Sequence, residues 1–135
     1  MIDLVTETDL PVLEFVDAVP GLPGMSRCVL VQLDDSGALF RLRSVIDTDL
    51  QLVVAAPSVF FDDYSPEIDD VTAESIGLTD VTDALLLVVV TVGATLATST
   101  ANLLAPIVVN QRTRQCVQVL QQSGAHSLHE PLLPA

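Results

Sequence analysis

The sequence predicts an all-β fold, and three observations support this prediction. Half of the 135 residues are hydrophobic, yet there is no tryptophan and only one tyrosine and four phenylalanines, so valine and leucine must build the core. The stretches 85–92 and 107–109 are rich in β-branched side chains, which suit a pleated strand better than a helix. Residues 38–45 alternate, with Arg41 and Arg43 on the face opposite to the apolar side chains.

A chain of 135 residues is long enough to bury a core of its own without metals or disulfides. No internal repeat or linker divides it. We therefore expect a single domain over residues 1–135, with a folded core at about 12–122 and a tail at 123–135, in which Pro131 and Pro134 disfavour regular structure.

The first strands follow from alternation and turn chemistry. Residues 12–17 alternate and predict the first strand, and the Pro-Gly-rich stretch 19–24 predicts an ordered tight turn. The next strand, 28–33, ends at the hairpin turn 34–37, where Gly37 can adopt a positive φ. We then expect strands at 38–45 and 51–56, joined by a turn at 47–49 and ended by Pro57.

The second half contains one helix among strands. Residues 65–68 could form a short strand, and Asp69 is a suitable N-cap for a helix through Ile76, with Gly77 as its left-handed stop. Further strands are expected at 84–92, 105–110 and 115–120. Residues 111–114 would form a hairpin, and Asn102 and Asn110 would bond local backbone in turns.

The charge balance points to a basic partner. The formal net charge is −13, and all five cations are arginines. Such an acidic surface repels phosphate backbones, so we expect no direct nucleic-acid binding. From Asp62 to Asp83 there are eight acids and no base, which is the strongest local bias in the chain.

The N-terminus has acids where a signal peptide carries positive charge, so we expect a cytoplasmic protein. In that setting Cys28 and Cys116, both in apolar strand-like runs, are interpreted as buried thiols and not as a disulfide. Residues 84–104 lack charge and are a borderline candidate for a membrane span. Their small polar second half and β-branched first half favour two strands joined by a loop, so we expect no membrane association.

No motif indicates catalysis. The adjacent acids Asp62/Asp63 and Asp69/Asp70 point in different directions on a strand or helix, which makes a solvated acidic loop the simpler interpretation. His126, His129 and Glu130 have a metal-compatible spacing, but they lie in the predicted tail without further ligands. Phosphate-binding, nucleophile-elbow and Cys-x-x-Cys motifs are missing from the sequence. We expect no enzyme activity, no cofactor and no metal.

Aromatic residues gather beside acids at one place. Phe60, Phe61 and Tyr64 flank Asp62 and Asp63, in a chain with only five aromatic residues. Aromatic side chains next to charge are typical of an interface with a polar rim. The alternative is that the two phenylalanines pack beneath the loop and only the acids face solvent.

Several sequence blocks stand out by their order and spacing: Gly21-Leu-Pro-Gly24, the run from Leu39 to Leu50, Phe60-Phe-x-Asp-Tyr64, and above all Thr100-Ala-Asn-Leu-Leu-Ala-Pro-Ile-Val-Val-Asn110 with Thr113-Arg114. Together these blocks resemble the flagellar assembly factor FliW family. The resemblance spans residue 12 to Leu132. It implies an antiparallel pseudo-barrel of about seven to nine strands with one or two short helices, and no enzyme activity.

The resemblance also implies two competing partners, flagellin and the RNA-binding translational regulator CsrA. Flagellin would occupy the protein while it is abundant in the cell, and the protein released after flagellin export would bind CsrA and relieve its repression of flagellin translation. CsrA-type proteins are basic, so a partner of charge −13 would be steered toward them. We hypothesise that the docking surface comprises Asp62, Asp63, Tyr64, Glu67, Asp69 and Asp70.

Two other interpretations remain open at this stage. The protein could be a flagellin chaperone alone, or a general acidic protein-interaction module without CsrA antagonism. Flagellin would use a more apolar groove, since its terminal helices are amphipathic, but the sequence does not place that groove.

Overall fold

The structure, a computed structural model of the chain, describes residues 12–17, 19, 22–62, 64–121 and 127–132. Short strands dominate it, as predicted. In chain order they are β1 (Val12–Phe15), β2 (Arg27–Gln32), β3 (Leu39–Ser44), β4 (Gln51–Ala55), β5 (Ala84–Thr91), β6 (Thr100–Ala101), β7 (Ile107–Asn110), β8 (Gln115–Gln118) and β9 (Glu130–Pro131). The helical elements are α1 (Pro57–Phe60), α2 (Asp70–Ser75) and three 3₁₀ turns, η2 (Pro23–Met25), η3 (Val81–Asp83) and η4 (Leu96–Thr98).

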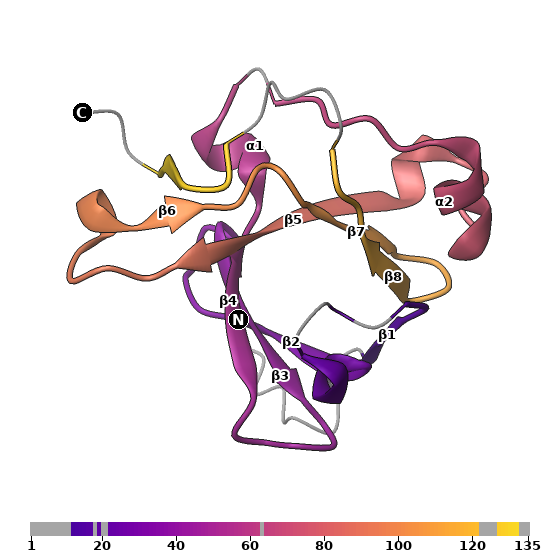
Figure 1. Ribbon diagram of the computed structural model, residues 1–135, viewed down its shortest axis with the longest axis horizontal. Helices are drawn as coiled ribbons and strands as arrows, with labels where there is room; N and C mark the ends of the chain where they lie inside the picture. The colour runs from indigo at the N-terminus through magenta and orange to yellow at the C-terminus, as the bar shows by residue number, and fades with distance from the viewer. Residues whose placement is uncertain (1–11, 18, 20–21, 63, 122–126, 133–135) are drawn as a thin grey trace.

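Seven of the strands close into a barrel. Their order is β4-β3-β2-β1-β8-β7-β5, and β5 also pairs with β4, which completes the ring seen in Figure 1. The strands β6 and β9 continue from β5 outside the ring. The pseudo-barrel expected from the family resemblance is thus confirmed, with one difference: β1 and β8 pair in parallel, so the barrel is mixed and not purely antiparallel.

Alternate residues of the strands face opposite sides of the barrel wall. Leu42, Leu87 and Cys116 belong to the cluster that fills the ring, while their neighbours on the same strands, such as Val88 and Val117, belong to two clusters outside it. One outer cluster lies beneath α1, β6 and Leu132, and the other lies beneath α2. The part of the wall formed by β5, β7 and β8 is therefore covered by apolar side chains both inside and outside the barrel. This explains why β5 and β7 are nearly continuous aliphatic runs.

Several predicted elements are confirmed with small changes of length. The strands predicted at 12–17, 105–110 and 115–120 are shortened to β1, β7 and β8. Helix α2 has Asp69 as its N-cap, and it is followed by Gly77 at φ +69°. A residue with a Cβ would be strained at that angle. The stretch 84–104 is strand, loop and strand, and no helix among the described residues is long and apolar enough to span a membrane.

The second short helix, α1, agrees with the one or two that the family resemblance implies, although no residue pattern placed it. Its single turn begins at Pro57, whose fixed φ suits a first helical position, and the Phe61 N–H donates to the Pro57 carbonyl at 2.8 Å. Two predictions are corrected. The possible strand at 65–68 does not form, because Pro66 lacks a donor and the backbone of Glu67 bonds to a side chain instead. The predicted tail at 123–135 includes β9, which pairs with β6, and Leu132, which is 2% exposed.

Candidate functional site

The candidate site is the acidic connection between β4 and β5, which we define as residues 56–83. It contains α1, α2 and η3, and all its charged residues are acids. In Figure 1 it leaves the barrel at α1, crosses above β5 and reaches α2 at the opposite end. Since β4 and β5 are neighbours in the barrel, a tight hairpin could have joined them. The chain instead places this long excursion on the outside of the wall.

The aromatic residues fasten the beginning of the acidic connection. Phe60, Phe61 and Tyr64 pack against the outer cluster that contains Val88 and Leu103. The Tyr64 hydroxyl donates to the Leu103 carbonyl at 2.7 Å, and burial raises the pKa of Tyr64 to about 12, which keeps the donor protonated. The second interpretation of the aromatic cluster, packing beneath the loop, therefore describes the phenylalanines. Tyr64 is half-buried and already holds a backbone partner.

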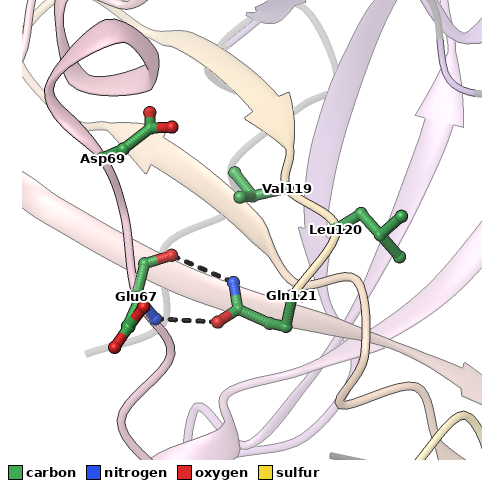
Figure 2. Close-up of a pocket in the computed structure, with 5 residues that line it drawn as sticks. All are labelled: Glu67, Asp69, Val119, Leu120 and Gln121. Atoms are coloured by element: carbon green, nitrogen blue, oxygen red, sulfur yellow. Dashed lines mark hydrogen bonds between the residues drawn. The ribbon is translucent and has the colours of Figure 1, made fainter. Parts of the chain in front are cut away.

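A buried glutamine fastens the middle of the connection. The Gln121 side chain accepts a hydrogen bond from the Glu67 N–H at 2.8 Å and donates one to the Glu67 carbonyl at 3.0 Å, as Figure 2 shows. The side-chain amide thus forms the two hydrogen bonds with Glu67 that the backbone of a neighbouring strand would otherwise form. Beside it lies an open cavity of about 240 Å³, lined by Glu67, Asp69, Val119, Leu120 and Gln121. The lining is mainly polar, and the side chain of Leu120, which is 63% exposed, points away from Glu67 and Asp69 (Figure 2).

Asp69 and Asp70 begin the helix α2. The Asp69 carboxylate accepts from the Thr72 N–H at 2.8 Å, and hydrogen bonds from the Thr72 side chain and backbone lower the pKa of Asp69. Asp70 occupies the first turn and is exposed, where the helix dipole favours a negative charge. Asp69 thus has a structural role as a cap, whereas the Asp70 carboxylate is directed to solvent.

The 111–114 hairpin fastens the far end of α2. The buried Asn110 amide donates to the Ile76 carbonyl at 2.9 Å, and the Thr113 hydroxyl donates to the same oxygen at 3.0 Å. Arg112 donates to the Gly77 carbonyl at 3.0 Å. Cationic and polar donors at a helix C-terminus satisfy carbonyls that lack partners inside the helix. The Asn110 carboxamide oxygen also accepts from the Arg112 N–H at 2.9 Å, which confirms its predicted turn role.

The structure brings together only part of the predicted docking surface. Glu67 and Asp69 share the cavity, and Asp70 follows at the start of α2. Asp62 is exposed but does not line the cavity, and Asp63 lies outside the described residues. Sequence reasoning missed the wall formed by 119–121, because those residues continue a predicted strand and carry no local signal of a contact with Glu67.

The remaining reactive groups among the described residues are two buried thiols and one exposed histidine. Burial raises the pKa of Cys28 to about 11 and that of Cys116 to about 12, so both thiols are protonated at neutral pH. Neither forms a disulfide. His126 lies outside the described residues and His129 is exposed. Within the described ranges no three histidine, cysteine or acidic side chains converge as metal ligands. The arrangement can bind a cationic surface through its carboxylates.

Comparisons with known proteins agree on one family. The model of the family described as "FliW protein" matches residues 3–132. The flagellar assembly factor FliW of Bacillus licheniformis is 32% identical over 118 residues, which cover 87% of this chain and 82% of the relative. The protein of the same name from Geobacillus kaustophilus is 33% identical over 123 residues, with 91% and 85% covered. A crystal structure of the flagellar assembly factor FliW superposes with a TM-score of 0.86 at 31% identity, covering 99% of this chain and 92% of that one.

Proposed function

Since this chain belongs to the FliW family of flagellar assembly factors, we propose that it acts as a partner switch between flagellin and the regulator CsrA. In this proposal it binds flagellin as a chaperone-like partner. When flagellin has been exported, the free protein binds CsrA and relieves repression of flagellin mRNA translation. It acts in the cytoplasm, where both partners are made, and by binding alone, without catalysis.

The observation that carries the proposal is the acidic surface of α2 and the cavity beside it. Asp70 and Glu74 are exposed on α2, and Glu67 and Asp69 line the cavity next to the exposed Leu120. An interface of this kind offers an exposed apolar side chain near several acidic ones. CsrA-type proteins are basic, so complementary charge would raise the association rate and make it sensitive to salt.

The acidic surface can be tested without disturbing the fold. The double variant Asp70→Lys/Glu74→Lys reverses two exposed charges and leaves the Asp69 cap in place. Its matched control is Asp35→Lys/Asp49→Lys, which makes the same change of net charge at two exposed turn residues outside the acidic connection. Calorimetric titration with purified CsrA at low and high salt gives the affinities. We expect the α2 variant to bind at least about tenfold more weakly at low salt and the control to lose much less.

Two results would contradict the proposal in different ways. Equal affinities of the two variants for CsrA would exclude α2 as the docking surface. Retention of flagellin by the wild-type protein with no binding of CsrA at any salt concentration would favour the alternative, a chaperone for flagellin alone. Because flagellin helices are amphipathic, we expect flagellin binding to be less sensitive to the α2 charges.

A further inference from the structure

The strand β5 has an edge that its neighbour β4 does not cover. The pairing of β4 with β5 runs from Val53–Val90 to Ala55–Val88 and ends there. On the other edge, β7 pairs with β5 from Ala84 to Leu87. The first half of β5 is therefore bonded to a strand on one side only among the described residues.

The register identifies the backbone groups at this edge. The Asp83 carbonyl accepts from the Gln111 N–H, and the Val89 carbonyl accepts from the Asn102 N–H. The backbone N–H and C=O groups of the odd-numbered residues in this segment therefore point toward β7 and β6. In an antiparallel ladder successive residues point to opposite sides. The N–H and C=O of Leu86 therefore point toward the β4 side, two residues beyond the last pair.

The chain cannot extend β4 to meet Leu86. The residue that would face Leu86 is Pro57, which has no N–H to donate. The Ala56 N–H already donates to Ala38, and the Ala56 carbonyl accepts from Val59 as α1 begins. The turn into α1 leaves an open cavity of about 260 Å³ lined by Ala56, Pro57, Ser58, Tyr64, Ala84, Leu85 and Leu86.

The sequence around this edge is acidic, which favours a cationic occupant. From Ser44 to Gln111 the sequence has ten acids and no lysine, arginine or histidine, and all the segments that line the cavity fall in this range. Asp62 lies close in sequence to Tyr64, and Asp83 immediately precedes β5. Asp83 is partly matched by Arg112, whose Nε lies 3.8 Å from its carboxylate. An extended peptide gains ladder hydrogen bonds from an open edge, and flanking acids favour cationic side chains on it.

We propose that the uncovered edge of β5 at Leu86 binds an extended, lysine- or arginine-bearing segment of a partner protein by strand addition. The segment forms ladder hydrogen bonds with Leu86 and places an apolar side chain in the cavity beside Pro57 and Tyr64. This surface is separate from the acidic face of α2, so the inference stands independently of the proposed switch.

A peptide probe tests the proposal. The probe is acetyl-Lys-Val-Lys-Val-Lys-amide, accompanied by a version in which glutamate replaces lysine and by two versions N-methylated at alternate residues in opposite phase. Only one edge of an added strand faces β5, so one N-methylated version should lose at least about tenfold in affinity and the other should bind nearly as the parent does. Hydrogen exchange of the Leu86 amide, followed by NMR, should slow at least about tenfold on saturation with the parent peptide.

Two protein variants complete the test. Ser58→Trp fills the cavity from an exposed position of α1 and should abolish binding, while Val59→Trp, one residue further and 54% exposed, should not. An amide spectrum of each variant confirms the fold. The proposal is overturned if the glutamate peptide binds as well as the parent, if both N-methylated peptides bind like the parent, or if Leu86 exchange is unchanged at saturation. Equal affinities of the two tryptophan variants would also overturn it.

Discussion

Replacement of Gln121 by alanine should loosen the acidic connection from the barrel at a measurable cost. The side chain is 7% exposed and forms both of its hydrogen bonds with the backbone of Glu67. Each such bond contributes about 0.5–1.5 kcal/mol net, and water can reach the Glu67 side of the pair. We therefore expect a loss of about 2 kcal/mol in the free energy of unfolding, measured by urea denaturation.

The variant Gln121→Glu adds a test of geometry. Its carboxylate could still accept from the Glu67 N–H, but it would face the Glu67 carbonyl without a proton to donate. The protonated form is then favoured, and the pKa of the new side chain is raised in the folded state. A raised folded pKa gives stability that is present at low pH and lost as pH rises. The deficit relative to wild type should thus shrink as pH falls toward about 4.

The result that would refute this reasoning is specific. A loss of less than about 0.5 kcal/mol for Gln121→Ala, together with a Gln121→Glu deficit that does not change with pH, would show that the amide does not hold the connection. Hydrogen exchange of the Glu67 amide provides a local control, because it should accelerate in Gln121→Ala even if the global loss is small.

Three further predictions follow from single positions. Arg114 has φ +63°, so Arg114→Gly should raise the free energy of unfolding by about 0.5–1 kcal/mol in urea titrations, while Arg114→Ala should not. Burial raises the pKa of Cys28 to about 11 and that of Cys116 to about 12. Iodoacetamide at pH 8 should therefore leave both thiols of the native protein unmodified and alkylate both in urea, as measured by mass spectrometry. Backbone and side-chain hydrogen bonds from Thr82 lower the pKa of Asp80, so its NMR titration midpoint should lie below the ordinary aspartate value and should rise in Thr82→Val. Because the folded pKa is lowered, the stability that Asp80 contributes is present above its unfolded pKa and is lost as pH falls through its folded pKa.

The strands were predictable because their information is local. The alternation around Arg41, the aliphatic run of β5 and the β-branched residues of β7 each determine one strand by themselves. The same holds for α2, whose N-cap and left-handed stop are both encoded by residues within the element, Asp69 and Gly77.

The errors occurred where a distant residue decides the conformation. Residues 65–68 have no strand because the Gln121 side chain, far along the chain, satisfies the Glu67 backbone. The parallel pairing of β1 with β8 joins opposite ends of the sequence and leaves no local signal. The strand β9 has only two residues, and it forms because β6 offers an edge beside the site where Leu132 is buried.

The position of the acidic surface follows from how the barrel closes. The pairing of β4 with β5 completes the ring. The long connection between these two strands does not determine the register of their pairing, so its sequence is free to form the acidic surface. Contacts with Leu103, Gln121 and Asn110 hold it at three points. A partner bound to α2 would first change the environment of the 111–114 hairpin, because Asn110 and Thr113 both donate hydrogen bonds to the Ile76 carbonyl at the end of α2. Amide shifts on partner binding should therefore appear at α2 and at 110–114 while the β2 and β3 strands stay unchanged, and the opposite pattern would place the docking surface elsewhere on the barrel.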